Sequence, residues 1–248
     1  MDTAGLSEKI LRGDRRALAR AITLVESGRE DHRAAATALL EELAKSKRQS
    51  LRIGLSGTPG VGKSTFIESF GMFLTGQGLR VAVLAVDPSS ARSGGSILGD
   101  KTRMERLSRD RNAFIRPSPS QSHLGGVARR TREAVSLCEA AGFDVVLIET
   151  VGVGQDEVEI ANACATTVVV SAPGLGDEVQ AIKAGILEIA DIHVVSKCDR
   201  SDANRTLTDL KLMLKDQPPR DGWRPPVVGL SSVTGEGFDD LTAAMDRH

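Results

Sequence analysis

The chain has 248 residues, of which 40% are apolar and 26% charged, a composition typical of a globular protein with one good core and a small appendage. Its 32 basic and 33 acidic side chains leave a net charge of −1, which excludes a globally basic surface that binds nucleic acid by charge alone. Charged residues such as Glu8, Lys9 and Arg12 interrupt any secretory signal, and no run of roughly 18 apolar residues predicts a membrane span. We therefore expect neither a nucleic-acid partner nor a membrane.

The cysteines and histidines give no sign of a structural metal site. Cys138, Cys164 and Cys198 are odd in number, widely spaced and set in apolar surroundings. They read as reduced, mostly buried thiols of a cytoplasmic protein. The four histidines are equally scattered, and no Cys/His cluster has the spacing of zinc ligands.

The first 48 residues lack strand patterns. Apolar residues recur there at helical spacing, with Gly13-Asp14 and Gly28 as interruptions, which predicts amphipathic helices. We expect residues 1–48 to form a helical N-terminal appendage and residues 49–248 to form a second unit.

From residue 51 onward, short apolar runs alternate with helical patterns. The predicted strands are Leu51–Ser56, Arg80–Val86, Ala113–Ile115, Asp144–Glu149, Thr167–Ser171, Ile192–Ser196 and Val227–Leu230. The predicted helices are Lys63–Leu74, Thr102–Ser108, Val127–Ala141, Asp156–Cys164, Asp177–Ile189, Asp202–Lys215 and Phe238–Met245. Several strands are apolar on both faces, which favours an α/β fold with a mostly parallel sheet covered by helices on both sides. Right-handed crossovers then bring the carboxyl ends of the strands to one edge, where ligands bind.

A phosphate-binding loop connects the first predicted strand to the first predicted helix of this unit. Backbone N–H groups of such a loop and the helix N-terminus surround phosphate oxygens, Lys63 reaches the β- and γ-phosphates, and the Ser64 hydroxyl binds Mg²⁺. The alternative is a Gly-rich turn that happens to end in Lys-Ser. The expected nucleotide contacts are Gly57, Thr58, Pro59, Gly60, Val61, Gly62, Lys63, Ser64 and Thr65.

Acidic residues at strand ends are candidates for the metal site. Glu149 ends an apolar strand in the manner of a Walker B acid, and the N–H of Gly152 follows where it can sense a γ-phosphate. Asp87 ends another strand and Asp100 ends the Ser/Gly-rich loop after it; either can act on Mg²⁺ directly or through water. A solvent-facing carboxylate at Glu149 and a simple helix cap at Asp100 stay open as alternatives.

A second motif points to guanine. The segment Ser196-Lys197-Cys198-Asp199 resembles Asn-Lys-x-Asp with serine in the first place. The Asp199 carboxylate would accept from guanine N1–H and the 2-amino group, which adenine lacks, while the Lys197 stem lies on the base. Ser231, Ser232 and Val233 follow the last strand and fit the loop whose backbone N–H meets guanine O6.

Five longer runs of the sequence match one particular family of GTPases more specifically than they match GTPases in general. They are Val86–Ser90, Gly94–Met104, Leu124–Ala128, Glu149–Gln155 and Pro173–Gln180. They resemble the MeaB/ArgK family, the GTPase chaperones of methylmalonyl-CoA mutase and related adenosylcobalamin-dependent acyl-CoA mutases, over nearly the whole chain.

The resemblance implies a protein that holds GTP or GDP with Mg²⁺ and gates loading or protection of a partner mutase's cobalamin. It implies that Lys63, Asp87, Asp100 and Glu149 form the catalytic and switch site. It also implies that Pro173–Lys183 is a further switch loop that responds to the partner. The loop 88–99 is rich in Gly and Ser and adjoins the nucleotide edge, so we expect it to order and disorder at low cost.

Two features depart from the family pattern. Ser196 replaces the usual Asn, so we expect a lost contact to guanine N7 and lower base affinity. The sequence ends at His248, before the helical arm that joins family homodimers, which puts that dimer in doubt. A P-loop kinase and a GTPase of metal insertion are the alternative functions, and Gln155 is an unsupported candidate for positioning the attacking water.

Overall fold

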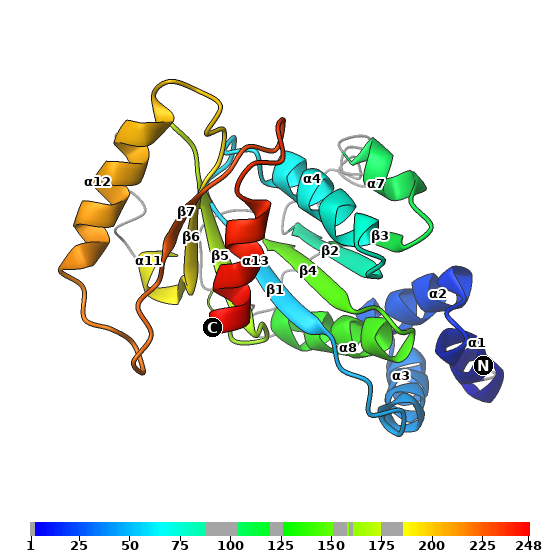
Figure 1. The fold of residues 1–248 in the computed structure, drawn as a ribbon. Coiled ribbons are helices and arrows are strands. Elements are labelled where there is room, and N and C mark those ends of the chain that lie inside the picture. The colour runs from blue at the N-terminus through cyan, green and yellow to red at the C-terminus, as the bar shows by residue number, and fades with distance from the viewer. Residues whose placement is uncertain (1–2, 88–103, 120–125, 151–157, 159–160, 175–185) are drawn as a thin grey trace.

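The computed structural model describes residues 3–87, 104–119, 126–150, 158, 161–174 and 186–248. Its centre is a seven-stranded sheet in which all strands run parallel, in the order β3-β2-β4-β1-β5-β6-β7 (Figure 1). The strands are β1 Leu51–Ser56, β2 Val81–Asp87, β3 Ala113–Pro119, β4 Val145–Thr150, β5 Thr166–Ser171, β6 Ile192–Val195 and β7 Val227–Gly229. The predicted α/β fold with a parallel sheet is confirmed.

One face of the sheet packs against α4 (Lys63–Gly76), α7 (Glu105–Arg109) and α13 (Phe238–Arg247). Phe66 and Phe70 of α4 and Phe238 of α13 are buried there against apolar side chains from the strands. Every residue of β4 and β5 is buried, as expected for central strands with helices on both faces.

The N-terminal helices cover half of the other face. They are α1 Thr3–Leu11, α2 Arg15–Glu26 and α3 Glu30–Ala44, and they share one apolar cluster with α8 (Gly126–Ala140) and with strands β2, β3 and β4. Two ion pairs fix this packing, Arg33 with Glu133 on α8 and Arg116 on β3 with Glu26. The helices predicted for residues 1–48 therefore complete the core of the sheet, while the exact division into two units stays a prediction.

Local sequence explains where α2 begins. Gly13 takes a left-handed conformation (φ +80°), and the Asp14 carboxylate then accepts hydrogen bonds from the backbone N–H groups of Arg16 and Ala17 at 2.8 and 2.9 Å. These bonds satisfy two N–H groups that the first turn leaves open.

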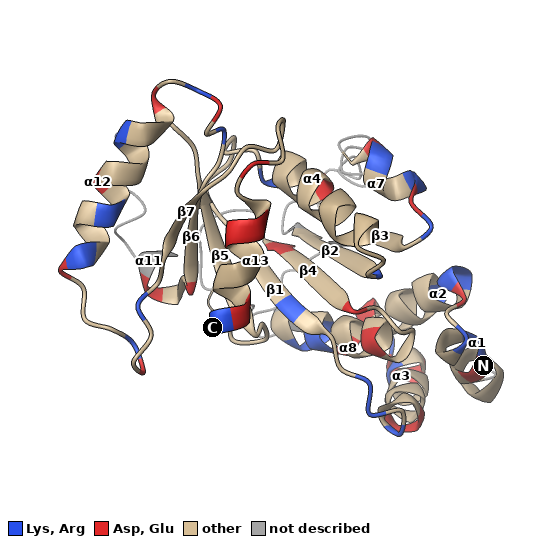
Figure 2. Cartoon of the chain, viewed as in Figure 1, with Lys and Arg blue, Asp and Glu red and all other residues tan. Residues whose placement is uncertain are grey.

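At the other end of the sheet, α12 (Ala203–Lys215) packs against β6 and β7. The short helix α11 (Ile186–Ile189) precedes β6 in the chain. Basic and acidic residues are interspersed over the helices (Figure 2). Among the residues that the structure describes, no helix has the length and apolar character needed to cross a membrane.

Several predicted boundaries need correction. β3 continues through Pro117 to Pro119, since it pairs with β2 alone and an edge strand tolerates proline. The helix predicted at Thr102–Ser108 is observed as Glu105–Arg109, one residue longer at its end, and residues 102–103 lie outside the described residues. Of the helix predicted at Asp177–Ile189, the described part is Ile186–Ile189. Of the helix expected at residues 156–164, residues 156, 157, 159 and 160 lie outside the described residues, Val158 and Ala161 are helical, and residues 162–164 are not.

The proline-rich connector before β7 is anchored by contacts of Trp223. The Trp223 indole N–H donates to the Asp191 carbonyl at 2.8 Å, and its ring lies 4.9 Å from that of His248. Cys138 is buried, whereas Cys164 and Cys198 are half-buried, and no disulfide joins the three.

Candidate functional site

The phosphate-binding loop leaves the middle of the sheet. β1 lies between β4 and β5, ends at Ser56, and continues through Gly57–Gly62 into α4, which begins at Lys63. The N-terminus of α4, with its partial positive charge, therefore faces the carboxyl edge of the sheet where the loop lies.

Glycine is required in this loop by space as well as by conformation. At Gly57 (φ +148°) a Cβ would lie 2.3 Å from the Val170 carbonyl oxygen on β5. The loop backbone thus touches the neighbouring strand at a distance that any side chain would prevent. Gly62, the residue before α4, has a φ of +92°, which L side chains rarely adopt.

The Lys63 side chain lies inside the loop. It is 8% exposed, and its ammonium group donates hydrogen bonds to the carbonyl oxygens of Gly57 and of Thr58, the latter at 3.2 Å. The loop therefore curls around the lysine head group, which places a positive charge among its backbone N–H groups.

The sheet brings the predicted metal residues Ser64 and Glu149 together. Glu149 is 5% exposed and lies in register between Leu55 on β1 and Ala85 on β2. The Ser64 hydroxyl donates to the Glu149 carboxylate, with 3.4 Å between the oxygens. A buried carboxylate beside a hydroxyl is an all-oxygen donor set, which fits a hard cation such as Mg²⁺.

The other predicted metal-site positions are only partly described. The backbone of Asp87 ends β2, next to β4, but its side chain is not described. Asp100 and Gly152 lie outside the described residues, as does Gln155. Within the described ranges, no group of three or more His, Cys, Asp or Glu side chains is placed to hold a metal ion.

The guanine motif lies against the phosphate loop. Lys197 has a left-handed backbone (φ +58°), and its Cε lies 3.7 Å from where a Cβ on Gly62 would be. Ser196 is 3% exposed, and its hydroxyl lies 3.0 Å from the carbonyl oxygens of both Val61 and Ser171. This hydroxyl connects the phosphate loop to the ends of β5 and β6, a link that the sequence did not predict.

Asp199 is positioned by the loop that follows β7. The Ser231 hydroxyl donates to the Asp199 carboxylate at 2.6 Å and accepts from the backbone N–H groups of Val233 and Thr234. The hydrogen bond from Ser231, together with the backbone N–H of Asp199 itself, holds the pKa of the Asp199 carboxyl below its usual value. Asp199 is thus an ionised acceptor at neutral pH, in the form that guanine recognition needs.

The rest of this loop is open on one side. Val233 is 84% exposed, whereas Ser231 is buried. The Ser232 carbonyl accepts from the Ser69 hydroxyl on α4 at 3.0 Å. Ser69 was not among the predicted site residues, because no sequence motif marks a contact between residues so far apart in the chain.

A family model described as methylmalonyl-CoA mutase-associated GTPase MeaB matches residues 18–248. The chain belongs to this family of GTPases. A putative GTPase of Caulobacter vibrioides is 55% identical over the whole of this chain and 77% of its own length. The GTPase ArgK of Escherichia coli is 46% identical over 99% of this chain and 76% of its own length.

A solved structure extends the agreement to the fold. The crystal structure of a protein named LAO/AO transport system kinase has a TM-score of 0.82 and 38% identity, over 99% of this chain and 74% of that one. The sequence-based assignment to the MeaB/ArgK family, to the P-loop NTPase fold and to GTP hydrolysis is therefore confirmed.

Proposed function

We propose that the chain binds GTP and Mg²⁺ at the carboxyl edge of its sheet and acts as the GTP-dependent partner of an adenosylcobalamin-dependent acyl-CoA mutase. The proposal of a nucleotide site rests on the hydrogen bond between the Ser64 hydroxyl and the Glu149 carboxylate, at 3.4 Å, beside the buried Lys63. It supports one phosphate and magnesium site built from two neighbouring strand ends and the start of α4.

In this proposal each residue of the phosphate side has a separate role. The Lys63 ammonium group balances charge on the β- and γ-phosphates, and the loop N–H groups orient them. Ser64 and Glu149 hold the metal, with Asp87, Asp100 and the N–H of Gly152 as further members of the site. When bound, Mg²⁺ supplies charge neutralisation to the transferring phosphoryl group.

The base side is supported by the Asp199 carboxylate, which Ser231 holds ionised. In this position Asp199 accepts from two donors of guanine, and adenine would leave that acceptor unpaired. Lys197 covers the base from the side of Gly62, and the loop Ser231–Val233 supplies a backbone N–H to guanine O6. The buried Ser196 hydroxyl supports the phosphate loop and leaves N7 without the contact that an Asn would make.

The partner follows from membership of the family, whose description names methylmalonyl-CoA mutase. We infer slow intrinsic hydrolysis that the mutase accelerates, through the loops 88–99 and 173–183. Nearly all of both loops lies outside the described residues; Gly174, at the start of the second, has a left-handed φ of +84°. A partner that favours the GTP state must change nucleotide affinity by the same factor in return.

The test is to measure GTP turnover while a purified methylmalonyl-CoA mutase is titrated in. We expect turnover to rise by about tenfold, which corresponds to a barrier lowered by about 1.4 kcal/mol, and Lys63→Ala to abolish it. If turnover is insensitive to every cobalamin-dependent mutase tried, the partner half of the proposal is wrong.

A kinase is the second candidate, because the similar protein of known crystal structure carries that name. A kinase of this kind would require GTP turnover to respond to an added amino acid, and metal insertion would require it to respond to Ni²⁺. The same assay, run with each of these additions in place of the mutase, separates the three functions.

A further inference from the structure

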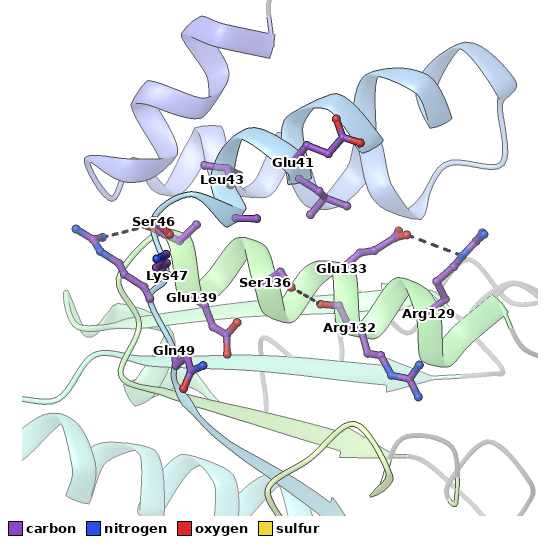
Figure 3. Close-up of a pocket in the computed structure, with 14 residues that line it drawn as sticks. Glu41, Leu43, Ser46, Lys47, Gln49, Arg129, Arg132, Glu133, Ser136 and Glu139 are labelled. Carbon is purple, nitrogen blue, oxygen red and sulfur yellow. Dashed lines mark hydrogen bonds and ion pairs between the residues drawn. The ribbon is translucent and has the colours of Figure 1, made fainter.

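A pocket lies between the N-terminal helices and α8, on the side of the sheet that does not carry α4 and α13. It has a volume of about 740 Å³ and is bounded by the end of α3, the connector 46–49 and the outer surface of α8. Figure 3 shows Arg129 and Arg132 at one end of the pocket, Lys47 and Gln49 at the other, and Ser136 between them. Leu40, Leu43 and Ala44 add apolar surface.

Two of the three carboxylates that line this pocket, Glu133 and Glu139, accept hydrogen bonds from residues outside it. Glu133 accepts a bidentate pair of hydrogen bonds from Arg33, at 2.6 and 3.0 Å. Glu139 accepts from the Ser50 hydroxyl and backbone N–H at 3.2 and 3.3 Å. Glu133 and Glu139 on α8 thus have partners within the protein, whereas Glu41, the third carboxylate that lines the pocket, is exposed on α3.

The positive charges are not engaged to the same degree. Arg129 is 55% exposed and lies 3.9 Å from Glu133, a weak contact. Within the described part of the chain, no hydrogen bond or ion pair holds the Arg132 guanidinium or the Lys47 ammonium group, and both side chains are exposed. The pocket thus offers uncommitted positive charge at its two ends and apolar surface between them.

The spacing of these charges defines the length of a ligand. Arg48 donates to the Ala140 carbonyl at 3.1 Å, which places the connector beside the last turn of α8. From Arg129 to Ala140, α8 rises by about 16 Å at 1.5 Å per residue. An extended peptide covers that distance with about five residues at 3.3 Å each.

We propose that this pocket is a docking site for an extended acidic segment of a partner protein, with carboxylates at both ends and apolar side chains between them. Its carboxylates would pair with Arg129 and Arg132 at one end and with Lys47 at the other. A nucleic acid fits less well, because its continuous negative charge would lie over the apolar surface of Leu40, Leu43 and Ala44 and over the exposed Glu41. The site is separate from the nucleotide site and does not depend on the proposed mutase partner.

The test uses the whole chain and a fluorescein-labelled peptide of three leucines flanked by two glutamates on each side. Fluorescence anisotropy should show saturable binding that weakens at least tenfold when glutamine or lysine replaces the glutamates. The pair Arg129→Glu and Arg132→Glu should weaken it at least tenfold. Ser136→Trp, which fills the middle of the pocket without changing charge, should do the same.

The matched control is the pair Lys211→Glu and Lys215→Glu, which makes the same charge change on exposed positions of α12. This pair should change peptide affinity less than twofold, and all variants should bind GDP as the parent chain does, which shows that they fold. Equal weakening by both charge-reversed pairs, full binding of the glutamine peptide, or tighter binding of an oligo-dT strand than of the peptide would overturn the proposal.

Discussion

His193 gives a prediction about the strand that carries the guanine motif. It lies in β6, three residues before Ser196, paired in register with Val169 and Val227, and it is 0% exposed. Neither ring nitrogen has a hydrogen-bond partner among the described residues. Burial lowers the pKa of the His193 imidazole from 6.5 to about 4, so the folded protein keeps this ring neutral well below neutral pH.

The sign and size of the effect follow from this shift. Below pH 6.5 the unfolded chain takes up a proton at His193 that the folded chain refuses until about pH 4, so stability falls as pH falls through this window. With about 1.4 kcal/mol per unit, the loss at pH 5 is about 2 kcal/mol. Above pH 6.5 this residue contributes no pH dependence.

The assay is urea unfolding of the parent chain and of His193→Leu at pH 7.5 and pH 5.0. The leucine variant should lose about 2 kcal/mol less between the two pH values. It should not be less stable at pH 7.5, because it removes two buried nitrogens that have no partner among the described residues. His32→Ala, at a partly exposed ring, is the control and should behave as the parent chain does. The same pH dependence in His193→Leu and the parent chain would refute the reasoning.

Three further predictions concern the nucleotide site. Glu149→Gln should lower GTP turnover at least tenfold and change GDP affinity less than threefold in titrations; an equal loss of both would contradict a role centred on the triphosphate. Ser231→Ala removes the donor that holds Asp199, so GTP affinity measured by calorimetry should fall about five- to tenfold, as a net hydrogen-bond contribution of about 1 kcal/mol implies, and unaltered affinity would exclude this support. Gly57→Ala places a Cβ 2.3 Å from a β5 carbonyl, whereas Gly60→Ala meets no atom within 4 Å; thermal unfolding should show a much larger loss for Gly57→Ala, and equal losses would assign the effect to backbone φ alone.

The sequence predicted the parts of the site that follow from chain direction. Neighbouring parallel strands end at one edge, so Glu149 had to lie near the loop that β1 enters, and the structure places it 3.4 Å from Ser64. The length of β3 was underestimated, because its edge position, which permits Pro117 and Pro119, depends on strand order.

Contacts between distant residues that neither a motif nor the direction of the strands brings together could not be predicted. The Ser196 hydroxyl meets the Val61 carbonyl across 135 residues, and Arg33 meets Glu133 across 100. The periodicity of the N-terminal segment predicted helices there, but it did not indicate that they would share a core with α8. Such packing depends on which apolar faces meet in space.

Recognition of guanine by Asp199 is the central claim, and the nucleotide preference of Asp199→Asn tests it most directly. The variant replaces an acceptor with a donor, which suits the 2-oxo group of xanthine. Calorimetric titration should show that its affinity for GTP falls at least a hundredfold while its affinity for xanthosine triphosphate rises by a similar factor. The control variant Asp209→Asn, on α12, should have the same affinity for both nucleotides as the parent chain. Continued preference of Asp199→Asn for GTP would contradict the assignment of the base site.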